Sequence, residues 1–411
     1  MKKKEKSFLN SLGPGLLFAG AAIGVSHLVQ STKAGAEFGF GLLWALLLVH
    51  LFKYPFFQFG PRYAAATGET LLDGYQKLGK GILVAYYILN FATMFTIQAA
   101  VTIVTAGLAS QLFGFTNDLV IWSSILMFTS VLFLVGGKYK WLDFLMKYII
   151  IILTISTIIA VCVALFSTKD AFDVTQILPS GSVELTFLIA FLGWMPAPLD
   201  VSIWHSIWSV EKDKTTLIKT KRKDAIFDFN VGYVGTLCLG ICFVLLGALV
   251  MYKTGEKFSN QGGIFASQLI NLYTKNLGQF FYIFIAIAAF TTMFSTTITT
   301  LDASPRAMNK ATSLLRGKGK EYKYGYWFWI LFLFLGTFLI LKFFMGNMGT
   351  LVKVATILSF LTAPFYAILN SLLIFGKHTP KKHRPGIYLK FLSIIGIIFL
   401  IAFSIWFLTS I

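Results

Sequence analysis

Two interrupted apolar segments decide the fold of this chain. The first, residues 20–36, reads Gly-Ala-Ala-Ile-Gly-Val-Ser-His-Leu-Val-Gln-Ser-Thr-Lys-Ala-Gly-Ala. The second, residues 192–206, reads Leu-Gly-Trp-Met-Pro-Ala-Pro-Leu-Asp-Val-Ser-Ile-Trp-His-Ser. Gly24 lies at the middle of the first segment, and Pro196 and Pro198 lie at the middle of the second. These residues predict that two apolar helices lose their winding at mid-length, which a bilayer tolerates only where the backbone lines a cavity inside the protein.

The rest of the chain has the composition of an integral membrane protein. Of its 411 residues, 56% are hydrophobic and 13% are charged, whereas soluble proteins have roughly 45–50% and about 25%. One soluble core could not bury so much apolar surface, which excludes a soluble multidomain enzyme. Eleven apolar runs approach or exceed the roughly 20 residues that a span needs, and they predict an all-α polytopic membrane protein. The runs are 12–36, 40–61, 82–112, 118–136, 141–167, 185–209, 230–252, 279–303, 325–345, 349–375 and 387–410.

The distribution of positive charge predicts how these spans are oriented. With the N-terminus inside, the inner segments hold 26 lysine and arginine residues, whereas the long outer loops 168–184 and 253–278 hold 4. Cytoplasmic loops are the ones enriched in these residues, so we expect a plasma-membrane protein with the N-terminus in the cytoplasm and the C-terminus outside. The same bias accounts for the formal charge of +18 and removes the need for a nucleic-acid partner. The three cysteines lie in apolar runs without metal-ligand spacing, which gives no support to disulfides or a zinc site.

The two interrupted spans occupy equivalent positions in two halves of five helices. An odd number of crossings separates the halves, so their orientations are opposite. Matched interruptions in inverted halves point to the midplane binding site of a secondary transporter. We therefore predict one transport domain over residues 1–411, with repeat one at 12–167, repeat two at 185–375 and an extra helix at 387–410. We also predict a short amphipathic helix at the outer surface over residues 263–276.

Motifs spread over nearly the whole chain resemble those of the Nramp family of proton-coupled divalent-metal transporters. They are Gly13-Pro14-Gly15, the run from Gly35 to Trp44, Arg62 with Thr67-Gly68, Met195-Pro196, the run from Ser295 to Thr299, Leu358-Ser359 and Pro364-Phe365. The resemblance implies eleven or twelve spans in the inverted-repeat fold of leucine transporters, and transport of a metal ion without a cofactor.

The residues that bind metal in that family are altered here. Where the family has Asp-Pro-Gly-Asn at the span-one break, this chain has Gly24-Val25-Ser26-His27. The family's Met-Pro-His is Met195-Pro196-Ala197, and Gln98 and Val101 replace its acidic pair in span three. The resemblance thus implies a relative whose metal site and proton path have been rebuilt.

Several remaining polar groups are candidates for a substrate site. We expect His27, Met195 and Asp200 to be metal ligands, together with the carbonyl oxygen of Leu192. Gly24, Ser26 and Gln98 complete the predicted substrate-binding set. A carboxylate at bilayer depth is a functional candidate because its insertion costs about 2.5–3.5 kcal/mol. The alternative for Asp200 is a structural pair with Lys33, Lys53 or a histidine of a neighbouring helix.

Three hypotheses remain open from the sequence. The first is divalent-metal uptake, possibly proton-coupled, at a site of imidazole and thioether ligands that favour transition metals over Mg²⁺. The second is transport of a small anion or organic zwitterion, because helix N-termini at the breaks carry positive dipole ends and the family's aspartate is missing. The third, a membrane enzyme or sensor, lacks any catalytic motif in its support. The oligomeric state stays open.

Overall fold

The chain is almost entirely helical, and helices occupy all eleven predicted apolar runs. The computed structural model describes residues 13–136, 139–167, 173–254, 256–317, 322, 324–344 and 348–410. Its principal helices are α2 (Pro14–Ala22), η1 (Ser26–Ser31), α3 (Thr32–Phe38), α4 (Leu43–Thr67), α5 (Leu71–Leu78), α6 (Lys80–Phe113), α7 (Leu119–Gly136), α8 (Tyr139–Ser167), α9 (Ser182–Trp194), α10 (Val201–Thr216), α11 (Arg222–Val250), α12 (Gly262–Leu277), α13 (Tyr282–Leu315), α14 (Gly325–Phe344), α15 (Met348–Phe375) and α16 (Ile387–Ser410). The predicted amphipathic helix over residues 263–276 is present as α12.

Length and hydropathy identify the helices that can cross a bilayer. Within the described residues, seven helices are long and apolar enough, and an eighth span arises if α2 and the helix from Ser26 to Phe38 count as one broken span, bent by 44°. Three predicted spans fall outside this group. α4 carries polar residues such as Lys53 in its apolar run, α9 and α10 are separated by a segment that is not helical, and α8 counts only over Ile151–Phe166 as a shorter apolar helix. Polar or broken segments therefore account for two of these departures from a plain apolar rod.

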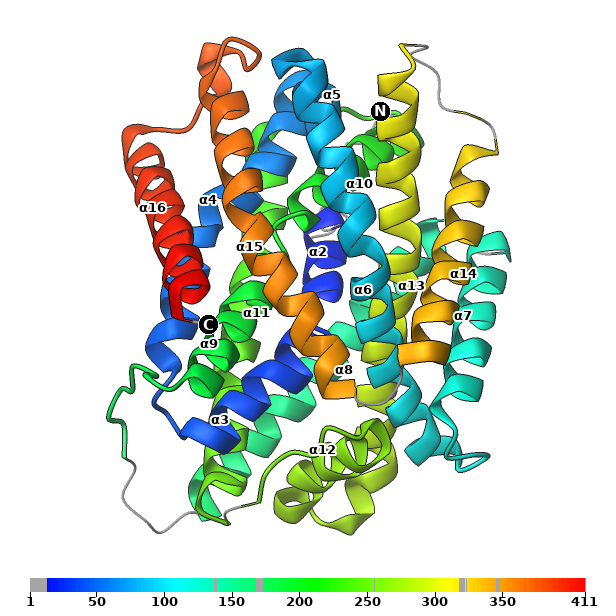
Figure 1. The fold of residues 1–411 in the computed structure, drawn as a ribbon, viewed down its shortest axis with the longest axis vertical. Coiled ribbons are helices and arrows are strands. Elements are labelled where there is room, and N and C mark those ends of the chain that lie inside the picture. The colour runs from blue at the N-terminus through cyan, green and yellow to red at the C-terminus, as the bar shows by residue number, and fades with distance from the viewer. Residues whose placement is uncertain are drawn as a thin grey trace, which may run out of the picture.

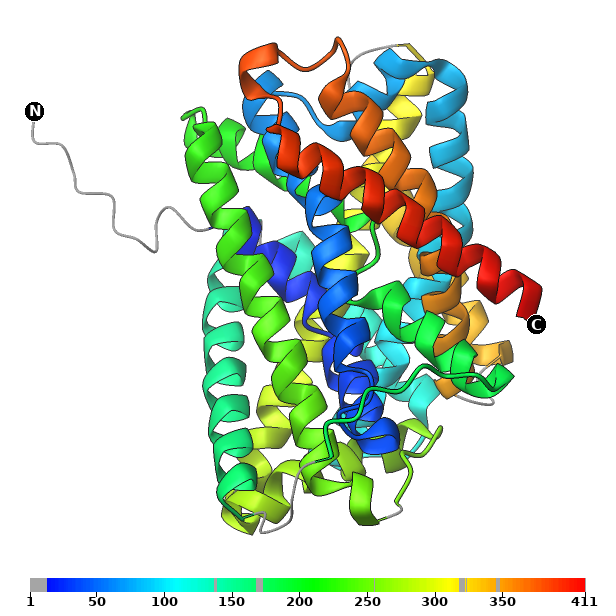
Figure 2. The same ribbon diagram turned by 90° about the vertical axis from the view of Figure 1, so that its left-hand side faces the viewer.

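The helices form an upright bundle with different structures at its two ends (Figure 1). α5 lies at the upper end of this view, near the end of α15, and α12 lies across the lower end. The basic connection between α10 and α11 is at the upper end too, whereas the segment before α9 runs along the lower end (Figure 2). α5 and the α10–α11 connection belong to segments predicted to be inner, and they lie at one end of the bundle. α12 and the segment before α9 belong to loops predicted to be outer, and they lie at the other end (Figures 1 and 2). The predicted tail 1–10, and parts of the loops 168–184 and 304–324, lie outside the described residues.

Peripheral helices expose apolar side chains on their outer faces. Examples are Phe128 on α7, Leu331 on α14 and Ile398 on α16, each more than half exposed. α7 and α14 lie at one edge of the bundle, and α16 lies at the other edge against α4 and α15 (Figures 1 and 2). A soluble protein rarely exposes so much apolar surface, whereas a bilayer stabilises it, so these faces are where lipid contacts the protein.

Glycine lets α11 pack closely against the second half of the broken first span. A Cβ atom on Gly35 would lie 2.0 Å from the carbonyl oxygen of Val244, and one on Gly247 would lie 2.2 Å from that of Thr32. Small residues at such crossings allow helix backbones to approach within a membrane. The two glycines thus fix α3 against α11 and hold the second half of this span in place.

Candidate functional site

The first span breaks where the sequence predicts. α2 ends at Ala22 and winding resumes at Ser26 as the π-helix η1. A Cβ atom on Gly24 would lie 2.9 Å from side-chain atoms of Thr296 on α13, so only glycine permits this close approach. The break therefore combines a backbone without regular helical bonds with tight packing against α13.

The second break separates α9 from α10. α9 ends at Trp194, a cis peptide bond joins Met195 to Pro196, and α10 begins only at Val201. Proline has no N–H group, so Pro196 and Pro198 cannot donate the hydrogen bonds that would continue the helix. The carbonyl oxygens before this segment consequently lack helical partners and must find others.

The ammonium group of Lys53 supplies those partners. It projects from the middle of α4 and donates to the carbonyl oxygens of Leu192 at 2.7 Å, Gly193 at 2.8 Å and Met195 at 3.0 Å. A fourth oxygen, of Ala197, lies at 3.4 Å. Lys53 is completely buried, at a depth where a charge costs about 2.5–3.5 kcal/mol on insertion scales. We call these four oxygens the carbonyl cage, and Lys53 is its occupant.

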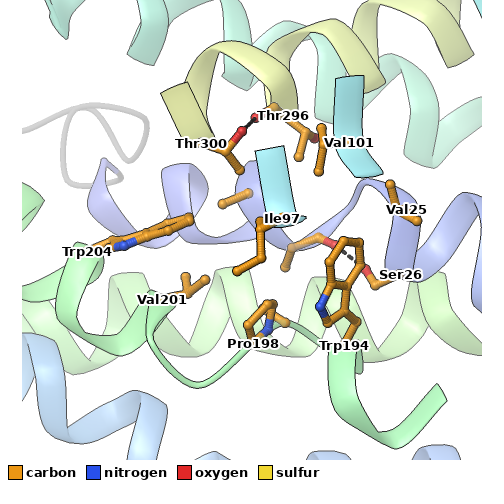
Figure 3. A pocket seen from close by; sticks show the side chains of 13 residues that line it. Val25, Ser26, Ile97, Val101, Trp194, Pro198, Val201, Trp204, Thr296 and Thr300 are labelled. Carbon is orange, nitrogen blue, oxygen red and sulfur yellow. Dashed lines mark hydrogen bonds between the residues drawn. The ribbon is translucent and has the colours of Figure 1, made fainter. Parts of the chain in front are cut away.

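A small cavity lies between the two breaks (Figure 3). Its volume is about 20 Å³, and it is walled by α2, η1, α6, α9, α10 and α13. Trp194 and Trp204 carry large indoles on its wall, and Ser26, Thr296 and Thr300 are its polar side chains. The full lining is Ala21, Ala22, Val25, Ser26, Ile97, Val101, Trp194, Ala197, Pro198, Val201, Trp204, Thr296 and Thr300. No acidic or basic side chain belongs to this lining.

The imidazole of His27 faces α11 instead of this cavity. Its Nε2 lies 2.9 Å from the carbonyl oxygen of Thr236, and its Nδ1 lies 2.8 Å from Oγ of Ser26. If Nε2 donates to Thr236, the neutral ring can accept through Nδ1 the single hydroxyl hydrogen of Ser26, for which the carbonyl oxygen of Ala22 is the competing acceptor. Both nitrogens are then occupied, and a metal ion would need the Ser26 hydroxyl to rotate away. Its assignment as a metal ligand stays a prediction.

Met195 and Asp200 occupy different parts of the second break. Sδ of Met195 accepts a hydrogen bond from Ser31 of η1 at 3.2 Å, which joins the two breaks directly. Asp200 immediately precedes α10, is buried, and has no hydrogen-bond partner for Oδ1. Its structural pairing with Lys53, which the sequence left open, stays a prediction. Neither side chain lines the cavity.

Gln98 belongs to a hydrogen-bonded cluster between α6 and α13. Its amide nitrogen donates to the carbonyl oxygen of Thr297 at 3.3 Å, and its amide oxygen accepts from Thr300 at 2.7 Å. The Gln98 side chain therefore links α6 to α13 and is not part of the cavity lining. Among the predicted binding residues, Ser26 alone lines the cavity with its side chain, while Leu192 enters the site through its carbonyl oxygen.

Metal-ligating side chains are sparse at the breaks. Across the part of the chain that the structure describes, no group of three or more His, Cys, Asp or Glu residues could hold a metal ion. Backbone oxygen atoms, the thioether of Met195 and the unpartnered carboxylate oxygen of Asp200 are the donors at the second break. The sequence pointed to Lys53 only as a partner for Asp200, although a lysine in the apolar run 40–61 was itself a signal of a buried polar contact.

A wider hollow lies at the α12 end of the bundle. Its volume is about 400 Å³, and Gln30 and Lys33 of the first span contribute to its wall. Three lysines line it, at positions 33, 257 and 353, against one acidic residue, Glu37, and Glu37 pairs with Lys33 at 3.6 Å. We call this hollow the basic vestibule. η1 supplies Ser26 to the cavity and Gln30 to the vestibule, so one helix lines both.

Comparison with known proteins identifies relatives over almost the whole chain. The family model described as "Natural resistance-associated macrophage protein-like" (Nramp) matches residues 15–410. A protein of Pasteurella multocida strain Pm70, "Uncharacterized protein PM0681", is 38% identical over 416 residues, which cover 99% of this chain and 94% of that protein.

Solved structures share the fold at low sequence identity. The manganese transporter of Eremococcus coleocola, crystallised with an aromatic bis-isothiourea compound, matches with a TM-score of 0.74 at 12% identity, covering 98% of this chain and 87% of that chain. MhsT in complex with L-phenylalanine matches with a TM-score of 0.65 at 14% identity over all of both chains. Mhp1, a nucleobase-cation-symport-1 family transporter, matches with a TM-score of 0.61 at 15% identity, covering 97% and 92%. These likenesses confirm the predicted inverted-repeat fold of the leucine-transporter type.

Proposed function

The chain belongs to the Nramp-like family, and from that premise we propose that it is a secondary-active transporter that carries a divalent metal ion through the site between its two breaks. It is a multi-pass membrane protein of a transporter family and not an enzyme. The proposal includes one transport domain over residues 1–411, a plasma-membrane location with the N-terminus inside, and no nucleic-acid partner.

The carbonyl cage is the observation that carries the proposal. Four backbone oxygens within 3.4 Å of one positive charge form a cation-binding arrangement, here around the ammonium of Lys53. Carbonyl oxygens left free by an unwound helix coordinate ions in transporters of this architecture. Met195, whose carbonyl oxygen belongs to the cage, also carries a thioether, and such a soft donor favours transition metals over Mg²⁺. The structurally similar manganese transporter of Eremococcus coleocola supports the same class of ion.

Alternating access follows from the position of the breaks. Both lie in the middle of the bundle and are joined by the contact between Ser31 and Met195, so movement of one half against the other would open the site to either side. Proton coupling is part of the proposal, with Asp200 and Lys53 as the titratable groups at the second break.

A second candidate function is transport of a solute that carries negative charge, such as a small anion or organic zwitterion. Three lysines against one glutamate line the basic vestibule, and such a surface attracts anions and repels cations. The cavity wall is mostly apolar and contains two tryptophans, which suits an organic solute better than a bare ion.

Uptake by the purified protein in proteoliposomes tests the proposal. A panel of small anions and organic zwitterions is tested beside Mn²⁺. We expect saturable uptake of Mn²⁺ and no uptake of any solute in the panel. Met195→Leu keeps the volume but removes the soft donor, so it should lower Mn²⁺ uptake. Met308→Leu, at another fully buried methionine on α13, is the matched control and should not. Uptake of an anion or zwitterion with no Mn²⁺ uptake would instead establish the second candidate.

A further inference from the structure

The carbonyl cage already contains a cation that belongs to the chain. Lys53 lies on α4, 139 residues before Leu192 in the sequence, and its ammonium donates to the Leu192 carbonyl at 2.7 Å. That carbonyl is one of the predicted metal ligands. The same oxygen atom therefore serves the lysine in this conformation and would serve the ion in another.

The geometry of the cage matches a tethered ammonium closely. An ammonium group has three N–H donors, and three of the four oxygens lie at 2.7–3.0 Å. A buried ammonium is stable only when it is paired and hydrogen-bonded, and the unwound oxygens need donors for the same reason. Each side satisfies the other, so the second break keeps its shape without a free ion.

We infer that Lys53 is a built-in competitor of the transported ion, whose ammonium and the free cation occupy the carbonyl cage in turn. The inference rests on the proposed function in that it takes the cage as the place where the ion binds. A divalent ion at the cage would meet the positive charge of Lys53 at contact distance, and this repulsion prevents both from being held together. The affinity for metal is thus set by how readily Lys53 leaves.

Asp200 is the acceptor for the displaced ammonium. It lies at the start of α10, is 4% exposed, and its Oδ1 has no hydrogen-bond partner. This unpartnered carboxylate oxygen at the second break would give the displaced charge a partner outside the cage. Entry of the ion at one side of the second break would then move Lys53 toward the other.

Cation binding to detergent-solubilised variants tests the inference without a transport assay. Lys53→Gln removes the charge and keeps a donor for the carbonyl oxygens, and Lys53→Met removes both. Lys342→Met, on the exposed face at the end of α14, makes the same charge change away from both breaks. Titration with MnCl₂ is followed by the midpoint of thermal unfolding.

We expect Lys53→Gln to bind Mn²⁺ at least about tenfold more tightly than the wild-type protein, because the competing charge is gone. Lys342→Met should bind as the wild type does. If Lys53→Met does not fold, a second measurement uses methylammonium added to Lys53→Ala. Methylammonium should raise the unfolding midpoint of this variant, and tetramethylammonium should not.

Equal Mn²⁺ affinities in the wild type and Lys53→Gln would overturn the inference, as would an absence of any methylammonium effect on folded Lys53→Ala. The two proposals fail differently. Tight Mn²⁺ binding by Lys53→Gln, with no Mn²⁺ uptake by the wild-type protein, would reject the proposed function and leave Lys53 as the occupant that excludes free cations from the cage.

Discussion

Asp228 holds the start of the broken first span, and its removal is the most direct test of how that span is anchored. The carboxylate, on α11, accepts hydrogen bonds from the backbone N–H groups of Gly13 and Gly15, both at 2.9 Å. These groups lie at the N-terminus of α2, where N–H groups lack helical partners and the helix dipole favours a negative charge. Asp228 is 4% exposed, so water does not replace it readily.

The structure sets the size of the expected loss. A hydrogen bond to a charged group contributes about 1.5–3 kcal/mol, and two of them with the dipole interaction of about 0.3–1 kcal/mol would sum to roughly 3–7 kcal/mol. Removing Asp228 also relieves the cost of burying its charge, which offsets part of this. We therefore expect Asp228→Ala to lower the free energy of unfolding by about 3 kcal/mol, or about a 150-fold change in the unfolding equilibrium.

The assay is equilibrium unfolding in mixed micelles, with a control from the same helix. Asp224 is exposed and lies in the first turn of α11, so Asp224→Ala loses only a surface dipole interaction of about 0.3–1 kcal/mol. If Asp228→Ala costs no more than Asp224→Ala, the two hydrogen bonds do not anchor α2. Proteolysis at the N-terminus should increase in Asp228→Ala alone.

Two further predictions concern helix packing and the end of the bundle at which α5 lies (Figure 1). Gly247→Ala places a Cβ atom 2.2 Å from a carbonyl oxygen of the first span and should cost about 1–3 kcal/mol, whereas Gly235→Ala on the same helix meets no atom within 4 Å and should leave the unfolding midpoint unchanged or slightly higher. Asp73 of α5 forms an ion pair with Lys310 at 2.8 Å; burial would raise the pKa of Asp73, but hydrogen bonds from Lys310 and Thr70 outweigh burial and lower it. A lowered pKa means that the pair stabilises the protein at pH values above the usual aspartate range, and that this stabilisation is lost as the pH falls through and below about 4. The unfolding midpoint of the wild-type protein should therefore decline more steeply in this pH range than that of Asp73→Asn. Equal slopes of the midpoint against pH would contradict this.

The sequence identified the breaks because their causes are local. Glycine at Gly24 and proline at Pro196 and Pro198 act through the conformations of their own backbone, and these features are visible without any tertiary contact. The same holds for the apolar runs, whose length and composition dictate helices in a bilayer. The eleven helical segments and the inverted-repeat fold were therefore predictable from the chain alone.

The site residues were only partly predictable, because each depends on the neighbour that its side chain meets. His27 lies at the break as expected, yet its ring turns toward Thr236 on α11. Gln98 faces α13 instead of the cavity. Nothing in the local sequence states which way a ring or an amide at a given helix position points, since that depends on the packing of helices distant in the chain.

Lys53 shows the limit most clearly. Hydropathy shows that Lys53 is an unusual charge in an apolar run, but it does not show which groups compensate that charge. The sequence by itself determined that carbonyl oxygens near Met195 lose their helical partners, while only the packing of α4 against α9 decided that a lysine 139 positions away satisfies them. The physical reason is that winding is a short-range property of the backbone, whereas the neutralisation of a buried charge requires partners that only the assembled bundle brings within hydrogen-bond distance.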